Sequence, residues 1–249
     1  MTRGPPSTFD DAFVLSLVPF GDVDVVARLF TRRDGRIGAF ARAAKTSKRR
    51  FPSGLSSLAY GVVTTRVRAS GELRALEGFD PEPGYFGLGS DPLRYGRAAY
   101  LAELVERLLP EGVAEPELFA TLRQALALLA EGAGDARLLR AFELKLLAAT
   151  GYLPDLNSFC GDGSSDEDAL CYIDRNTGEL LTTAGPSRIS FPARARRAAL
   201  DLYENSLTEP PQVATDVLRE VSRLFAAHLR AIGVQNLRSV EFLRSLPSG

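Results

Sequence analysis

The fold can be approached from residues 23–44, VDVVARLFTRRDGRIGAFARAA, which hold the strongest hairpin signal of the chain. At the centre of this stretch, Asp34-Gly35 is a dipeptide typical of the tight turns that join antiparallel strands. Short runs of apolar residues on both sides favour two strands, over residues 23–31 and 36–44. The stretch therefore predicts a β-hairpin.

Further strands are indicated on either side of this hairpin. Residues 12–20 alternate around Phe13, Leu15 and Leu17, and Gly21-Asp22 supplies a turn into the hairpin. Two more strands are indicated over residues 58–67 and 73–79, joined at Ser70-Gly71. Five short antiparallel strands in one segment predict a small Greek-key barrel of the OB type, which we assign to residues 1–80.

The remaining residues, 81–249, are expected to form a second, α-helical domain, so that the fold class is α+β. Residues 81–92 are rich in Gly, Pro and Asp and predict a linker or boundary. The apolar spacing then changes to a helical one. Helices are expected over 101–109, 118–132 and 137–150, from residue 192, after Pro210-Pro211, and over 240–246. Residues 155–190 lose this periodicity and predict an irregular arm inside the helical domain.

The charge of the chain is divided unequally along its length. Eleven Lys or Arg residues and one acid, Asp34, lie between Arg28 and Arg68, so the first 80 residues carry a net charge of +5 and the rest −6. Such a local excess is typical of a surface that binds phosphates, although a solvated loop gives the same pattern. Phe40 and Phe51 flank the densest part, residues 45–50. Aromatic rings beside cations on a small barrel can stack on bases, but the core is an equally plausible place for both rings.

These observations give ten candidate DNA-binding residues: Arg36, Phe40, Arg42, Lys45, Lys48, Arg49, Arg50, Phe51, Arg66 and Arg68. A second basic group lies at the end of the arm and just after it, and consists of Arg188, Arg194, Arg196 and Arg197. Arg137 and Arg140 begin an expected helix. For these residues a solvated helix start is a simpler explanation than a binding role, although cations at a helix start are slightly unfavourable with respect to the helix dipole.

Several functional classes find no support in the sequence. No phosphate-binding loop, nucleophile elbow or metalloprotease helix motif occurs, so we expect no enzyme and no cofactor; a metal-dependent nuclease using scattered acids is the enzymatic alternative. The single histidine, His228, lies on the apolar stripe of a late helix, which favours core packing. The acidic segment Asp162–Asp168 lacks a calcium-loop glutamate, because Ile173 stands at that position.

The cellular location can also be predicted. The apolar runs are too short for a membrane span, and Asp10-Asp11 argues against a signal peptide. Two cysteines make no disulfide framework, which agrees with a reducing compartment. We expect a cytoplasmic protein.

Motifs along nearly the whole chain resemble the RecO family of bacterial recombination mediators. The resemblance is carried, in order, by residues 18–24, 29–31, 34–36, 48–52 with Leu55, 100–104, 140–147 and 151–155. It implies an N-terminal OB barrel, a helical domain interrupted by an arm, and a nucleoid-associated function in DNA repair. It further implies binding of single- and double-stranded DNA, strand annealing and, with RecR, loading of RecA on DNA coated by single-strand-binding protein. The alternative is a generic OB-fold binder of single-stranded DNA or RNA without these partners; a purely structural scaffold is a third possibility.

The resemblance also implies a partner site and a zinc ribbon. The family binds the acidic, phenylalanine-ended tail of single-strand-binding protein in its helical domain, for which Arg137, Arg140, Arg194, Arg196 and Arg197 are candidates. The family's arm resembles a zinc ribbon with two Cys-x-x-Cys pairs. Here Cys160 matches one ligand, whereas Asn157, Thr182 and Gly185 stand at the other three positions. A structural zinc site needs about four ligands, so we expect a degenerate ribbon without metal, in which Cys160 and Cys171 are buried or free thiols, near enough to pair in one reading.

Overall fold

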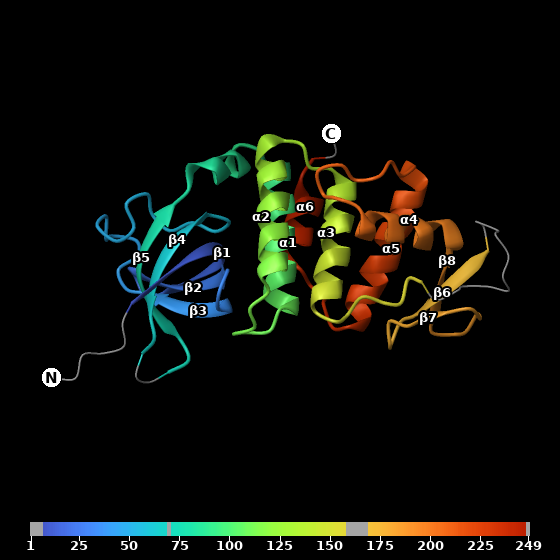
Figure 1. The fold of residues 1–249 in the computed structure, drawn as a ribbon, viewed down its shortest axis with the longest axis horizontal. Coiled ribbons are helices and arrows are strands. Elements are labelled where there is room, and N and C mark those ends of the chain that lie inside the picture. Colours follow the sequence, from blue (N-terminus) through green and yellow to red (C-terminus); the bar gives the residue numbers. More distant parts are fainter. Residues whose placement is uncertain (1–6, 69–70, 158–168, 248–249) are drawn as a thin grey trace. The chain divides into compact units, whose positions relative to one another are not determined.

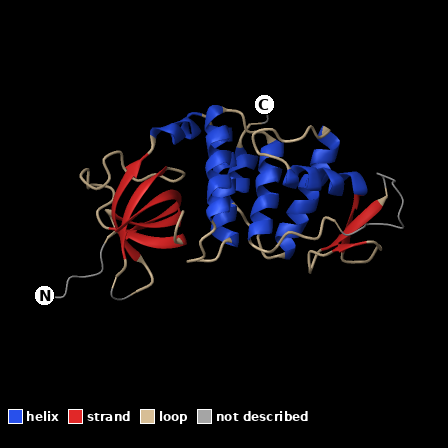
Figure 2. Cartoon of the chain, in the orientation of Figure 1, coloured by secondary structure: helices blue, strands red, loops and turns tan. Residues whose placement is uncertain are grey.

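A computed structural model describes residues 7–68, 71–157 and 169–247 of the chain. Two compact units are present, one formed by residues 1–132 with 242–249 and the other by residues 133–241. Figures 1 and 2 show strands in the N-terminal part of the chain and helices in most of the rest. The predicted α+β class, with an N-terminal five-stranded barrel followed by helices, is confirmed.

Five strands close the barrel in the order β1-β2-β3-β5-β4. They are β1 (Thr8–Phe20), β2 (Asp24–Thr31), β3 (Gly35–Ala41), β4 (Tyr60–Arg66) and β5 (Arg74–Pro81). Neighbours pair antiparallel except β3 and β5, which pair in parallel at Ala39–Arg74 and Phe40–Ala75. The predicted hairpin joins β2 to β3, with Gly35 at a φ of 67°. A glycine tolerates this left-handed conformation without steric cost.

Strand β1 differs from the prediction in length and in its alternation. It begins at Thr8 because Thr8–Phe13 pairs with β4, whereas its later half pairs with β2. A bulge between Val14 and Ser16 shifts the alternation by one residue. Before the bulge Val14 faces the barrel core and Phe13 faces outward, opposite Phe30; after the bulge Leu17 packs against the core and Phe20 faces outward.

The segment predicted as a linker is instead ordered secondary structure. Residues Pro83–Ser90 form the short 3-10 helix η1, in which Tyr85 and Leu88 are buried. It packs against α1 (Pro92–Leu108) and α2 (Pro116–Glu131), which belong to the same compact unit as the barrel. The predicted division into domains 1–80 and 81–249 stays a prediction.

The second unit combines helices with a small sheet. Its helices are α3 (Ala136–Ala149), α4 (Ala193–Glu204), α5 (Thr215–Ala231) and the start of α6 (Arg238–Ser245). The arm forms a three-stranded antiparallel sheet in the order β7-β6-β8, from β6 (Leu170–Asp174), β7 (Leu180–Leu181) and β8 (Arg188–Pro192). Among the described residues, no helix is long and apolar enough to cross a membrane.

Candidate nucleic-acid interface

The loop after β3, residues 42–50, carries the densest positive charge and is fixed to the turn between β1 and β2. We call it the basic loop. Ala43 adopts a φ of 51°, and its N–H donates to the Asp24 carboxylate at 2.6 Å. The Lys45 N–H donates to the Val23 carbonyl at 3.1 Å, and Lys45 Nζ to the Asp22 carbonyl at 3.0 Å. Strand β3 therefore ends at Ala41 rather than at the predicted residue 44, and the loop folds back over the turn.

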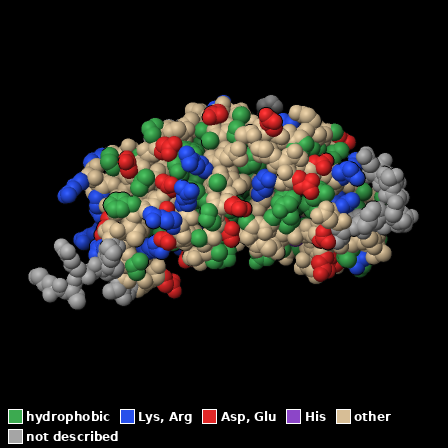
Figure 3. Space-filling view, viewed as in Figure 1, with side chains coloured by type: hydrophobic (Ala, Val, Ile, Leu, Met, Phe, Trp, Pro, Cys, Tyr) green, Lys and Arg blue, Asp and Glu red, His purple; other side chains and the backbone are tan. Residues whose placement is uncertain are grey.

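Four predicted DNA-binding cations of the basic loop are exposed: Arg42, Lys45, Lys48 and Arg49. Within the described residues, none of these four forms an ion pair with a carboxylate. Arg50 is half-buried; it donates to Ser47 Oγ at 3.3 Å and to the Arg42 carbonyl, so it shapes the loop. Figure 3 shows Lys and Arg side chains gathered over the barrel.

Two other predicted cations are engaged within the protein. Arg36 donates through Nε to the Leu109 carbonyl at 2.8 Å and lies 3.2 Å from Glu111, which also pairs with Arg28 at 3.3 Å. Arg66 pairs with Glu77 at 2.7 Å. These partners compete with any phosphate for the two guanidinium groups.

The two predicted stacking rings occupy different environments. Phe51 is 1% exposed and belongs to the barrel core, so we exclude it from a stacking role. Phe40 is half-buried on the outer face of β3, opposite Val26 of β2. Its ring lies 5.5 Å from that of Phe20 at an angle of 85°, and the Arg68 guanidinium lies 6.0 Å from its centroid.

Phe20 is an exposed aromatic residue that lies against Phe40 and was not among the predicted DNA-binding residues. It is 60% exposed at the end of β1. The expected alternation treated Phe13, Leu15 and Leu17 as one face; the bulge at Leu15 instead places Phe13 on the outer face, the same face as Phe20. The aromatic residue directly before the Gly21-Asp22 turn was the available signal.

A groove crosses β1, β4 and β5 and reaches the basic loop, whose residues Ser47, Arg49 and Arg50 line part of it. It has a volume of about 820 Å³ and is lined by residues that include Phe9, Arg49, Val62, Glu77 and Asp80. A hydrogen bond from Ser7, together with Arg66, holds the pKa of Glu77 below its ordinary value. The groove therefore presents carboxylates beside Arg49, which disfavours a phosphate track.

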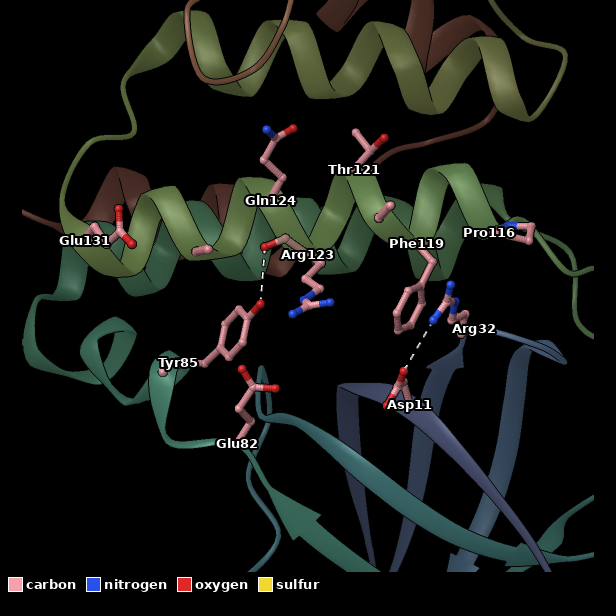
Figure 4. A pocket seen from close by; sticks show the side chains of 13 residues that line it. Asp11, Arg32, Glu82, Tyr85, Pro116, Phe119, Thr121, Arg123, Gln124 and Glu131 are labelled. Carbon is pink, nitrogen blue, oxygen red and sulfur yellow. Dashed lines mark hydrogen bonds and ion pairs between the residues drawn. The ribbon is translucent and has the colours of Figure 1, made fainter.

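A second cleft, of about 720 Å³, lies between the rim of the barrel, η1 and α2 (Figure 4). Arg32 lies 3.9 Å from Asp11, and the Tyr85 hydroxyl donates to the Arg123 carbonyl at 3.4 Å. Burial raises the pKa of Tyr85, so its phenol stays neutral at physiological pH. Because Glu82, Glu131 and Asp11 balance the two arginines, this cleft offers no excess of positive charge for a nucleic acid.

The five arginines predicted to bind a partner peptide differ in accessibility. Arg137 lies 2.7 Å from Asp135, the residue that caps α3, and Arg140 lies 2.5 Å from the buried Glu143. Arg196 donates to the Leu156 carbonyl, Arg194 is half-buried, and Arg197 is exposed on α4. Arg188 lies in β8 and donates to the Thr183 carbonyl at 2.7 Å. Arg197 is therefore the member of this group most open to a ligand.

The arm keeps strands where a ribbon was expected, but its ribbon character stays a prediction. Cys171 is buried in β6, whereas Cys160 and the acidic run Asp166–Asp168 lie outside the described residues. Over residues 7–68, 71–157 and 169–247, no group of three or more His, Cys, Asp or Glu side chains could hold a metal ion.

His228 is part of the core, as its position on the apolar stripe predicted. It is 3% exposed; Nε2 lies 2.6 Å from the Tyr152 carbonyl and Nδ1 3.1 Å from the Gly178 carbonyl. Burial lowers its pKa. The ring thus connects α5 to the arm and to the end of α3.

Comparison with known proteins gives matches over both parts of the chain. The family model described as "Recombination protein O N terminal" matches residues 7–82, and "Recombination protein O C terminal" matches residues 89–239. The "DNA repair protein RecO" of Pelobacter propionicus is 37% identical over 242 residues, covering 94% of this chain and 95% of the relative. That of Myxococcus xanthus is 33% identical over 241 residues, covering 94% and 96%.

Proposed function

Because the chain belongs to the RecO family of DNA repair proteins, we propose that it is a non-enzymatic recombination mediator that binds DNA through the basic loop. The observation that carries this proposal is the set of exposed cations on a loop fixed to the β1–β2 turn. A fixed loop holds several charges at a constant spacing, so less conformational entropy is lost when phosphates bind.

The proposal includes the finer activities that the resemblance implies. The protein binds single- and double-stranded DNA, anneals complementary strands and, together with RecR, assists the loading of RecA on DNA coated by single-strand-binding protein. Its place of action is the nucleoid in the cytoplasm. Supporting features are the barrel and the local charge of +5 over the first 80 residues.

A partner peptide is expected to bind in the helical part of the chain. An acidic tail that ends in phenylalanine needs an apolar slot and a cation. We propose Arg197 as that cation, because it is exposed while Arg137 and Arg140 pair with carboxylates. Binding of the tail peptide to the Arg197→Ala variant should be weaker than to the parent. Capture of the peptide by the parent also separates a recombination mediator from the alternative, a generic OB-fold binder.

The proposed DNA-binding role is tested by the salt dependence of affinity. In the triple variant with Lys45, Lys48 and Arg49 replaced by Ala, the slope of log affinity against log salt should fall by about 0.7 for each lost phosphate contact on single strands. The loss should be uniform across sequences, since phosphates carry no sequence information. Stability should change little, because these side chains are exposed.

A matched control removes the same charge elsewhere. Arg107, Arg219 and Arg230 are exposed on α1 and α5, and replacing these three by Ala should leave the salt slope unchanged. Equal slopes for the parent and the basic-loop variant would refute the role of the loop. A parent that shows no salt-sensitive DNA binding would refute the proposed function itself.

A further inference from the structure

The outer face of β1 and β3 ends in an exposed aromatic pair that the basic loop does not cover. Phe20 is 60% exposed, and its ring meets that of Phe40 edge-on at 5.5 Å. Val18, 50% exposed, and Val23, 40% exposed, extend the apolar surface around the turn. Contiguous exposed apolar surface of this kind marks an interaction site on a folded protein.

The position of the rings is fixed by the barrel. Phe20 is paired with Asp24 at the end of β1, and Phe40 stands opposite Val26 in the β2–β3 ladder. The barrel that carries these strands is closed, so neither strand is a free edge. A ligand that meets this pair therefore meets rings that are already ordered, which lowers the entropic cost of binding.

One cation lies over the aromatic pair, and a second is held at the neighbouring turn. Arg68 stands over the Phe40 ring at 6.0 Å, and Lys45 Nζ is held on the Asp22 carbonyl, two residues after Phe20. Asp22 and Asp24 are the acids at this turn, and the Asp24 carboxylate already accepts the Ala43 N–H. The pair thus combines apolar faces with positive charge, which matches a polyanion that presents flat apolar rings. A second copy of the chain would bring the same cations against it and be repelled.

We propose that Phe20 and Phe40 form a stacking platform for unpaired DNA bases and make binding at the basic loop selective for single strands. This inference rests on the proposed function, because the basic loop supplies the phosphate contacts. Bases of a duplex are already stacked on their neighbours, so their faces are not available to a protein ring. Unpaired bases can stack on aromatic side chains, and the stacking tolerates any sequence.

The test compares two phenylalanines of almost equal exposure. Phe9, 61% exposed, lies at the start of the same strand, in the groove where Glu77 and Asp80 stand beside Arg49 and Arg50 of the basic loop, so it controls for an exposed ring near the same cations. Phe20→Ala should weaken binding of a single-stranded oligonucleotide about 5- to 150-fold, which corresponds to about 1–3 kcal/mol. Its affinity for a duplex of the same length and its salt slope should stay as in the parent. Phe9→Ala should bind both DNAs as the parent does, and Phe20→Trp should restore single-strand binding.

The possible outcomes separate this inference from the proposed function. If the parent binds DNA with a salt slope but Phe20→Ala keeps full single-strand affinity, the platform is refuted and the proposed function stands. An equal loss of affinity for duplex and single strand would also refute selectivity by stacking, as would a loss with Phe9→Ala alone. If the Phe20→Ala variant binds DNA as the parent does but binds an acidic peptide more weakly, the platform is refuted and the pair is a protein-docking surface. Circular dichroism of each variant confirms that its fold is intact.

Discussion

The outer face of β1–β3 carries a pair of phenylalanines at each end. One pair is buried, whereas the other is open to solvent. Phe13 and Phe30 are opposite each other on β1 and β2, and each ring lies 5.3 Å from that of Phe119 on α2. They are 1% and 0% exposed. At the other end, Phe20 is 60% exposed and Phe40 is half-buried. We call these the covered pair and the open pair.

The difference between the pairs shows how one sheet face can serve both stability and binding. Burial of a large ring beneath α2 removes apolar surface from water and stabilises the first unit. The open pair contributes less to stability, because most of the Phe20 surface remains in water. Its conformation is nevertheless fixed by the same strands. The covered pair therefore explains the fold, and the open pair is available for a ligand.

The largest expected effect is on stability at the covered pair. Phe30→Ala should lower the free energy of unfolding by about 3–5 kcal/mol, since it removes a fully buried ring and leaves a cavity. Phe20→Ala should lower it by about 0.5 kcal/mol, as for an ordinary surface substitution. Urea denaturation of both variants measures the difference. Similar losses of unfolding free energy in the two variants would contradict the difference in burial between the two pairs.

The next effect concerns Gly35, which lies close to the backbone of Val113 near the covered pair. Gly35 has a φ of 67°, and a Cβ there would collide with the Val113 carbonyl. Gly35→Ala should cost more than the roughly 1–3 kcal/mol of a left-handed backbone alone. Gly54→Ala is the matched control, because Gly54 has a φ of 80° and open space around its Cα. The melting temperature of Gly35→Ala should be lower than that of Gly54→Ala. The reverse order would contradict the close packing of Gly35 against Val113.

The smallest effect is expected between the two pairs, at Glu111. This carboxylate pairs with Arg28 and Arg36 and is about half exposed, at 49%. Glu111→Gln should therefore change stability by about 0–1 kcal/mol. It should also raise DNA affinity slightly at low salt, because it removes the negative charge that neutralises Arg28 and Arg36. Glu209→Gln, an exposed change in the second unit, should raise it less. A lower affinity after Glu111→Gln would show that the ion pairs hold the face in its binding form.

The sequence predicted those features of the fold that depend on local patterns. The hairpin at Asp34-Gly35, the five strands and the positive loop follow from residues close together in the chain. The bulge in β1 does not, because it depends on β1 pairing with two different strands. The alternation expected from the sequence therefore placed Phe13 with Leu17, whereas the bulge turns Phe13 to the outer face of the strand.

Arg36 and Arg140 were predicted to bind ligands, but each already has a partner within the protein. Arg36 meets Leu109 and Glu111, which lie more than 70 positions further along the chain, so only the fold brings them together. Arg140 and Glu143 are three residues apart on one helix, and this spacing could have indicated their pairing. The burial of Phe51 followed from closure of the barrel around it, for which the residues beside it gave no sign.

The most direct measurement of the central claim is photo-cross-linking of a single-stranded oligonucleotide that contains iodouracil, followed by mass spectrometry of the peptides. A halogenated base that stacks on a ring cross-links to that ring. The open pair predicts cross-links at Phe20 or Phe40, and none at these residues when the same label is placed in a duplex. Cross-links confined to Phe9 and its groove, or equal yields from single strand and duplex at the open pair, would contradict it.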